Sequence, residues 1–396
     1  MSTKQILYVS ALASEKKINI EYNLSGKNPG FAVQKFSRLL VRGLQANGIK
    51  VQVLSSSTDL SGTKRFAKTA REMEYGVYYK YVPFLNVPII KHLCLFFYVF
   101  FYVLLWGING KENKALICDV LSISICMGAL LASKLNKVQS IAMVTDIYGM
   151  MVGKDNGTLK FKLSARLNFR YTNCFNKYIL VTEQMNEVVN LKGRPYIVME
   201  AICDSSLLQN ACNYTHKVQP RTIMYAGGIF EEYGLKMLAE GFLKANVPDT
   251  KLVYYGEGTY VAEFMALCEK NPNIEYKGMA LNDTIVEEEH KATLLVNPRF
   301  TKGKFTSYSF PSKNMEYMVS GTPLLTTKLA GIPKEYFPYV LFFEDESVEG
   351  YAGAIKSALA RSETELYELG GSAKRFVLMK KNNIEQGRRI CEFLFE

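Results

Sequence analysis

The chain has 396 residues, of which 48% are hydrophobic and 21% charged, and its formal net charge is +11. This length favours two domains of about 200 residues each, and the composition excludes a disordered chain. The charge is uneven, because residues 1–200 carry 26 Lys and Arg against 12 Asp and Glu, a net +14, whereas residues 201–396 carry −3. The basic half predicts an anionic partner surface. We expect a membrane leaflet and no nucleic acid, because the basic residues are dispersed and no nucleic-acid module is present.

The eight cysteines form no CxxC pair and lie mostly in apolar runs. This pattern predicts buried free thiols in a reducing compartment and no metal site. The first residues, MSTKQILYVSA, lead directly into a strand-like run without the charged and apolar regions of a signal peptide. We therefore expect a cytoplasmic protein.

Strand-like and helix-like runs alternate along the first half. QILYVSAL is followed by a helix-like run over residues 31–48, whose apolar positions recur every three or four residues, and then by IKVQVLSS. Alternation of this kind is typical of an α/β fold with parallel strands and crossover helices. Gly30, in the first strand-to-helix loop, predicts backbone room near an acceptor or a donor phosphate, and a simple turn explains it equally well.

Residues 93–106, LCLFFYVFFYVLLW, are fourteen consecutive apolar residues with lysines before and after them. The run is shorter than the roughly 20 residues that span a bilayer, so a transmembrane helix is not expected. Two interpretations remain open: a helix buried between the sheet and its neighbours, or a helix lying in the plane of a membrane.

Asp146 follows the strand-like run SIAMVT. Side chains at the carboxyl ends of parallel strands meet ligands, so Asp146 is the candidate to orient an acceptor hydroxyl or the donor sugar. An N-cap of a helix is the competing interpretation. Only three histidines are present, at 92, 216 and 290, and none lies in such a motif. Catalysis by a histidine acid or base is therefore not expected.

A second alternating series begins at residue 221, after a polar connector over 205–220. We predict a first domain over residues 1–210, a second over 211–372, and a last helix over 373–396 that returns to the first domain. Two doubly wound, Rossmann-like domains place the carboxyl ends of two sheets against a shared cleft, where such sheets bind ligands.

Two features of the second series suggest phosphate binding. Gly227 and Gly228 follow a strand-like run, where glycines let backbone N–H groups approach a phosphate, although a tight turn explains them as well. In SYSFPSKNMEYMVSGTPLLTT, Pro311 suits a first helical turn that Ser309 or Ser312 would cap. Lys313 in that turn opposes the helix dipole unless it binds an anion, and a solvated surface lysine is the alternative. Glu316, in apolar company, needs hydrogen-bond donors, which ribose hydroxyls would supply; an internal partner or solvent is the alternative.

The second half resembles a known family through YAGGIFEEYGLKMLAEGF, LVYYGEG, NIEYKG, LLVNPR and SYSFPSKNMEYMVSGTPLLTTKLAGIPKEY. In order and spacing these motifs are similar to the C-terminal domain of retaining GT-B glycosyltransferases of family four, in the bacterial branch that builds capsular and exocellular polysaccharides. NPGFAVQKF, VTDIYGM, YILVTEQMNEVV and YIVMEAICD extend the resemblance through the first half.

The resemblance implies transfer of a sugar from a nucleoside diphosphate donor, here a UDP-sugar, with retention of configuration and no metal or other cofactor. We further expect a lipid-linked saccharide as acceptor. The basic first half with its apolar run over 93–106 predicts a location at the inner face of the plasma membrane. The donor-binding residues would be Gly227, Gly228, Met279, Ser309, Phe310, Pro311, Ser312, Lys313 and Glu316. Gly30 and Asp146 would bind the acceptor, and Asp146, Lys313 and Arg299 would be catalytic.

The chain departs from the family where many members carry a glutamate, an arginine and a lysine: here these positions are Tyr308, Gly228 and Tyr233. We infer that Arg299 and Lys313 supply the positive charge instead, with Lys302 and Lys304 as further candidates; a surface salt bridge is the alternative for Arg299. Two other functions remain open. One is a non-catalytic nucleotide-sugar-binding partner of a polysaccharide assembly complex, and the other is a sugar-nucleotide epimerase on the same fold.

Overall fold

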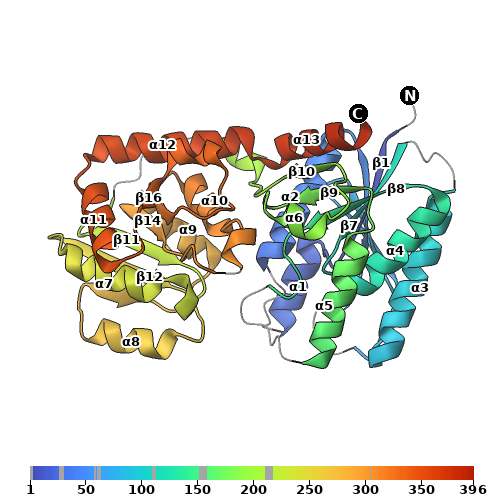
Figure 1. The fold of residues 1–396 in the computed structure, drawn as a ribbon, viewed down its shortest axis with the longest axis horizontal. Coiled ribbons are helices and arrows are strands. Elements are labelled where there is room, and N and C mark those ends of the chain that lie inside the picture. Colours follow the sequence, from blue (N-terminus) through green and yellow to red (C-terminus); the bar gives the residue numbers. More distant parts are fainter. Residues whose placement is uncertain are drawn as a thin grey trace. The chain divides into compact units, whose positions relative to one another are not determined.

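A computed structural model of the chain describes residues 3–25, 31–57, 59, 64–108, 113–150, 158–209, 217–303 and 305–396. The chain forms two compact units (Figure 1). Unit 1 comprises Met1–Asp204 and Asn382–Glu396, and unit 2 comprises Ser205–Lys381. Each unit is built on one mainly parallel sheet, so the predicted α/β fold with two parallel-sheet domains is confirmed.

Unit 1 has an eight-stranded sheet in the order β10-β9-β8-β7-β1-β2-β5-β4, in which only β4 is antiparallel to its neighbour. Its strands, including the separate β3–β6 pair, are β1 Gln5–Ser10, β2 Lys50–Ser55, β3 Phe66–Ala67, β4 Ala70–Glu74, β5 Val77–Tyr81, β6 Phe84–Leu85, β7 Lys114–Asp119, β8 Gln139–Val144, β9 Lys177–Leu180 and β10 Tyr196–Val198. Its helices are α1 Glu15–Ser25, α2 Phe31–Ala46, α3 Pro88–Trp106, α4 Ile123–Asn136, α5 Leu159–Thr172, α6 Met185–Val189 and α13 Asn383–Phe395.

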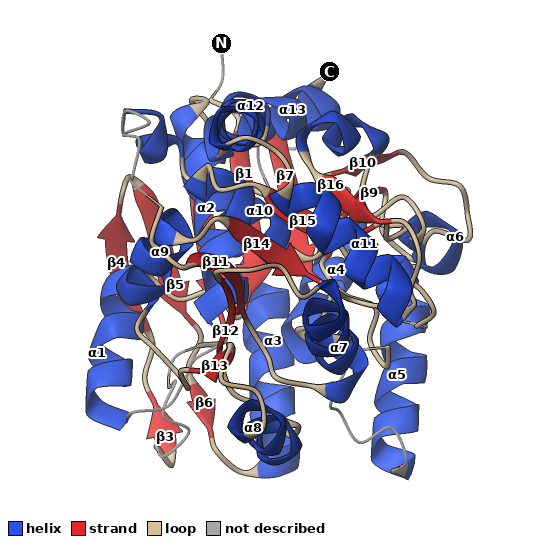
Figure 2. Cartoon of the chain, turned by 90° about the vertical axis from the view of Figure 1, so that its left-hand side faces the viewer, coloured by secondary structure: helices blue, strands red, loops and turns tan. Residues whose placement is uncertain are grey.

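Unit 2 has a six-stranded parallel sheet in the order β13-β12-β11-β14-β15-β16. Its strands are β11 Arg221–Ala226, β12 Thr250–Tyr255, β13 Ile274–Tyr276, β14 Leu294–Asn297, β15 Leu324–Thr327 and β16 Leu341–Phe343. Its α-helices are α7 Leu235–Ala245, α8 Val261–Glu269, α9 Asn282–Lys291, α10 Ser312–Ser320, α11 Val348–Leu359 and α12 Glu363–Lys380, and its short 3-10 turns are Ser205–Gln209, Glu231–Tyr233, Thr306–Tyr308 and Lys334–Tyr339. In Figure 2, α9 and α10 lie on one side of this sheet, and α7 and α11 on the other.

The predicted helices follow from their sequence pattern. The run over 31–48 is α2, and it ends before Gly48, whose φ of +79° stops the helix as expected. Its Leu39, Leu40 and Leu44 are buried as predicted, whereas Val33 is exposed. The seven described cysteines are free, but the expectation of burial fails for Cys94, which is exposed on α3.

The chain passes between the units at two points that differ from the predicted limits. It leaves unit 1 after Asp204 rather than after residue 210, and it returns at Asn382 rather than at 373. The reason is that α12 packs against α10 of unit 2 and continues to Lys380. Asn382 then caps α13 by accepting a hydrogen bond from the Glu385 N–H at 3.0 Å, and α13 packs on α2 of unit 1.

The apolar run over 93–106 belongs to α3, which begins at Pro88, is 19 residues long and has a mean hydropathy of 2.0. By length and composition alone this helix could cross a membrane, but in unit 1 it packs against α4 as a surface helix. The interpretation as a buried helix is wrong, because only Leu95, Val99 and Val103 of α3 are buried. The opposite stripe is exposed, with an apolar side chain at every fourth position: Ile89, Leu93, Phe97, Phe101 and Leu105.

Candidate functional site

The strand order of unit 2 reverses between β11 and β14, the two central strands of its sheet. Chain connections leave these neighbouring strands in opposite directions, which opens a crevice at their carboxyl ends, where open α/β sheets bind ligands. Gly227 and Gly228 directly follow β11, and Arg299 lies two residues after β14. The topology therefore brings the predicted glycine turn and the predicted arginine to the same sheet edge.

Close backbone approach shapes the glycine turn. A Cβ on Gly256, after β12, would lie 1.7 Å from the carbonyl oxygen of Gly227, and Gly256 has a φ of +136° that other residues rarely adopt. At Gly228 an added Cβ would lie 2.5 Å from the Phe230 ring. Close packing within the chain is therefore enough to explain the glycines at 227 and 228 as a tight turn. Phosphate binding by this turn stays a prediction.

Arg299 lies over the ring of Tyr233, with its guanidinium carbon 4.4 Å from the ring centroid. A guanidinium at this distance from an aromatic face makes a cation–π contact, which holds Arg299 against Tyr233. No ion pair of Arg299 is found within the described ranges, so the alternative of a surface salt bridge is not what holds it. Tyr233, at a position where the resemblance implies a lysine, instead contacts an arginine.

The helix start predicted at 311–313 is present as α10, but neither serine caps it. Pro311 occupies the N-cap position, and no side chain accepts a hydrogen bond from the first turn. The Ser309 hydroxyl is buried and has no hydrogen-bond partner among the described residues. In the first turn the Asn314 N–H donates to the Pro311 carbonyl at 2.9 Å, and the Ser312 and Lys313 N–H groups lie at the end of the helix where its dipole would favour an anion.

Lys313 and Glu316 contact each other, because their side chains lie one turn apart on α10. The Lys313 Nζ is 2.7 Å from the Glu316 Oε2, and both side chains are partly exposed. Such a pair at the surface contributes little to stability, about 0.3–0.5 kcal/mol. This ion pair is the internal partner that stood as the alternative to ribose hydroxyls for Glu316, and it gives Lys313 a partner that a solvated lone lysine would lack.

Two buried residues hold α10 to the sheet by hydrogen bonds, and neither was identified from the sequence. The Tyr317 hydroxyl accepts from the Ala226 N–H at 2.8 Å and donates to the Ala226 carbonyl at 3.1 Å, at the end of β11. Asn314 accepts from the Asn297 side-chain amide at 2.7 Å, at the end of β14. In the sequence, Asn314 and Tyr317 are distinguished only by their position on the inward side of a short amphipathic helix. Together they hold the start of α10 against the β11–β14 crevice.

The remaining predicted donor residues of unit 2 differ in exposure. Met279 follows Gly278 and is exposed, so its side chain is free to contact a ligand. Phe310 is buried against Tyr336, with ring centroids 5.4 Å apart, which leaves only its backbone for a ligand. Lys302 is exposed, and Lys304 lies outside the described residues.

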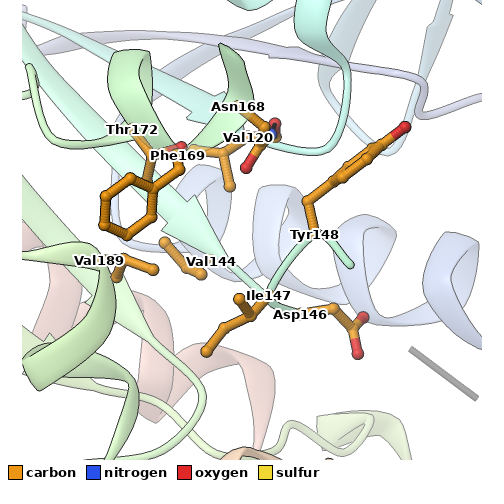
Figure 3. Close-up of a pocket in the computed structure, with 9 residues that line it drawn as sticks. All are labelled: Val120, Val144, Asp146, Ile147, Tyr148, Asn168, Phe169, Thr172 and Val189. Carbon is orange, nitrogen blue, oxygen red and sulfur yellow. Dashed lines mark hydrogen bonds between the residues drawn. The ribbon is translucent and has the colours of Figure 1, made fainter. Parts of the chain in front are cut away.

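In unit 1, Asp146 lines a cavity of about 20 Å³ near the carboxyl end of β8. This space holds about one water molecule and is too small for a sugar. Figure 3 shows the Asp146 carboxylate directed away from Val144, Phe169 and Val189, the apolar part of the lining. The N-cap interpretation of Asp146 is not supported, because the next described helix, α5, is capped by Thr158. Gly30 lies outside the described residues.

Asp119, at the end of β7, is a second carboxyl at this sheet edge. Burial raises its pKa from 3.8 to about 6, and the charge of Asp146 adds to the rise, whereas the hydrogen bond from the Leu121 N–H opposes it. The Asp119 carboxyl thus stays protonated to a higher pH in the folded chain than in the unfolded chain.

We expect Asp119→Asn to change the pH dependence of stability. The wild-type free energy of unfolding should fall as the pH rises from about 4 to 6, because the unfolded carboxyl ionises first, and the variant should lack this fall. At pH 7 the variant should be more stable by up to about 3 kcal/mol, at 1.36 kcal/mol per pKa unit. Urea unfolding at several pH values measures this, with Asp283→Asn, an exposed aspartate, as control. Identical pH profiles for wild type and Asp119→Asn would contradict the assignment.

The predicted residues thus lie in both units. Gly227, Gly228 and Arg299 follow the two central strands of unit 2, whereas Met279 follows the edge strand β13 and Asp146 lies in unit 1. No group of three or more His, Cys, Asp or Glu placed to hold a metal ion occurs in the parts of the chain that the structure describes.

Residues 220–361 match the family Glycosyl transferases group 1. The match covers β11 to α11 and therefore includes the whole crevice. No match was found among curated proteins.

Solved structures extend the similarity to the whole chain. A glycosyltransferase from Rickettsia africae ESF-5 has a TM-score of 0.66 at 12% identity, covering 100% of this chain and 98% of that one. Alr3699/HepE of Anabaena in complex with UDP has a TM-score of 0.62 at 12% identity, covering 98% and 99%. A mutant of S. aureus TarM, in complex with Fondaparinux, alpha-GlcNAc-glycerol and UDP, has a TM-score of 0.57 at 16% identity; the match covers 79% of this chain and only 60% of the mutant's length. The chain therefore has the GT-B fold, and its residues 220–361 are similar to the group 1 glycosyltransferase domain.

Proposed function

We propose that the protein is a retaining glycosyltransferase of family four that transfers a sugar from a UDP-sugar without a metal ion. The observation that carries the proposal is the uncapped start of α10, with Lys313 in its first turn, at the switch point of a group 1 glycosyltransferase domain. The HepE and TarM structures in complex with UDP support the choice of nucleotide.

In this mechanism the donor diphosphate lies at the first N–H groups of α10, and the ribose hydroxyls donate to Glu316. The ribose replaces Lys313 as the partner of Glu316, and Lys313 turns to the diphosphate. The acceptor oxygen forms a bond to the anomeric carbon on the face from which the diphosphate leaves, and its proton passes to the departing phosphate oxygen. Lys313, Arg299 and the helix dipole stabilise the charge that develops on the diphosphate, which is the main source of acceleration.

Asp146 orients the acceptor hydroxyl in our proposal, and a lipid-linked saccharide on the way to a capsular or exocellular polysaccharide is the acceptor. The protein would act in the cytoplasm, peripheral to the inner face of the plasma membrane. The exposed stripe of α3 supports this placement, because Lys91 at its start and five apolar side chains match an anionic lipid surface.

A non-catalytic nucleotide-sugar-binding partner is the second candidate. It is favoured by one observation, the ion pair in which Lys313 and Glu316 neutralise each other. Calorimetry with UDP and UDP-sugars, together with a turnover assay on a panel of nucleotide sugars with bacterial membrane lipids as acceptor, separates the two. Binding with transfer supports the enzyme, binding without transfer or hydrolysis supports the partner, and the absence of binding contradicts both.

A further inference from the structure

Helix α5 carries an apolar stripe that no described element of unit 1 covers. Leu159, Leu163 and Leu167 recur every four residues, and they are 82%, 67% and 40% exposed. Residues four apart lie on one side of an α-helix, so the three leucines form a continuous line along α5. On its inner side the helix is anchored by buried Asn168, Tyr171 and Thr172. The leucine line is therefore not the side by which α5 packs on the sheet.

Basic side chains border this line on both sides. Lys162, Arg166 and Arg170 form a parallel row about 60° around the helix from the leucines, at 100° per residue, and Lys160 lies on the other side. All four are exposed, and α5 contains no Asp or Glu. None of the four has an ion-pair partner among the residues that the structure describes. An apolar line between basic rows matches the boundary between acyl chains and anionic headgroups of a bilayer.

Topology places the start of α5 at the same end of unit 1 as the start of α3. The Lys114 Nζ at the beginning of β7 donates to the carbonyl of Trp106, the last residue of α3, at 2.6 Å. Likewise the Tyr178 hydroxyl of β9 donates to the carbonyl of Thr172, the last residue of α5, at 2.8 Å. Both helices thus end where parallel strands begin, and they start at the carboxyl edge of the sheet, the edge that carries Asp146. Figures 1 and 2 both draw α4 between them.

We propose that α5 is a second membrane contact of the protein, which binds an anionic lipid bilayer through the line Leu159–Leu163–Leu167 and its basic borders. The inference deepens the membrane association proposed above and rests on it.

A contact of α5 with the bilayer has a consequence for the acceptor. Asn168, Phe169 and Thr172 of the same helix line the cavity beside Asp146. A lipid-linked acceptor standing in this bilayer would then lie within about one helix diameter, roughly 10–12 Å, of the candidate acceptor residue.

The test is co-sedimentation of the full-length protein with vesicles, without donor or acceptor. Vesicles of phosphatidylcholine alone are compared with vesicles in which phosphatidylglycerol replaces part of it. We expect Lys162→Gln with Arg166→Gln to weaken binding to the anionic vesicles about 30-fold, because each basic residue near such a surface contributes about a fivefold factor. Leu159→Gln with Leu163→Gln should weaken binding to both vesicles at least about tenfold.

Matched controls lie on β4 of the same unit. Arg71→Gln and Met73→Gln remove an exposed charge and an exposed apolar side chain outside both helices, and they should leave binding unchanged. Thermal unfolding followed by circular dichroism checks that every variant folds. Leucine and charge variants of α5 that bind like wild type would overturn the inference. Light scattering that shows a dimer lost in the leucine variant would overturn it as well, in favour of a second copy on this face.

A third pair of substitutions keeps this inference separable from the proposed function. Phe97→Gln with Phe101→Gln removes part of the exposed stripe of α3. Loss of binding in the α3 variant together with wild-type binding in the α5 variants would overturn only the role of α5. Absence of vesicle binding by the wild type would overturn both membrane contacts, whereas sugar transfer is measured independently with a soluble acceptor analogue.

Discussion

Lys313→Ala is expected to lower kcat about 100-fold while changing KM for the UDP-sugar much less. Lys313 lies in the uncapped first turn of α10, and in the proposed mechanism it stabilises the charge that develops on the leaving diphosphate, so its contribution would be largest in the transition state. Glu316→Ala should act differently. It removes the acceptor of the ribose hydroxyls, which bind equally in ground and transition state, so KM should rise about tenfold or more with a smaller change in kcat.

Steady-state kinetics with varied UDP-sugar separates these effects, and calorimetry with UDP alone checks the loss of binding in Glu316→Ala. The control is Lys244→Ala, which breaks the exposed ion pair with Glu349 in the same unit. Because exposed pairs contribute little, the control should retain wild-type kinetics. Kinetic constants within about twofold of wild type for both α10 variants would show that this helix start does not hold the donor.

Gly256→Ala is expected to destabilise unit 2 by about 3 kcal/mol and to abolish UDP binding. The added Cβ would lie 1.7 Å from the carbonyl oxygen of Gly227, and the φ of +136° is strained for any residue with a Cβ. The strands β11 and β12 would have to separate at their carboxyl ends, which displaces the turn beside the crevice. Urea unfolding and calorimetry with UDP measure the two effects.

Gly353→Ala is the matched control for this substitution. Gly353 lies on the exposed side of α11, and an added Cβ there meets nothing within 4 Å. Alanine is the better helix former, so this variant should be more stable than wild type by about 0.5–1 kcal/mol and should bind UDP normally. Equal stability of Gly256→Ala and wild type would contradict the close approach of the two glycines.

Much of the fold could be predicted because the period of apolar residues reports local structure. The helix over 31–48, observed as α2, follows from such a pattern. The alternation of strands and helices likewise predicts a parallel sheet in each half. The chain passages at Asp204 and Asn382 could not be placed, because an amphipathic pattern does not say which unit a helix packs against.

The candidate site was predicted in part. Gly228, Arg299 and Lys313 were selected from separate segments, and the β11–β14 switch point brings those segments to one sheet edge. The role of Tyr233 was missed, because a cation–π contact with Arg299 joins residues far apart in the chain. Tyr317 was missed for the same reason, since its hydroxyl pairs with the backbone of another element.

By itself the sequence determined the fold class, the two-domain organisation, the basic first half and the residue types at the start of α10. Each of these depends on composition or on neighbours within a few residues of one another. Only the tertiary structure decided which apolar surfaces are covered. The run of α3 is apolar in the sequence and α5 has a leucine at every fourth position from 159 to 167, but the exposure of these side chains depends on whether another element packs on them, as α4 does on one side of α3. Burial is a property of the assembled chain, and an apolar pattern alone cannot distinguish a core helix from one that faces outward.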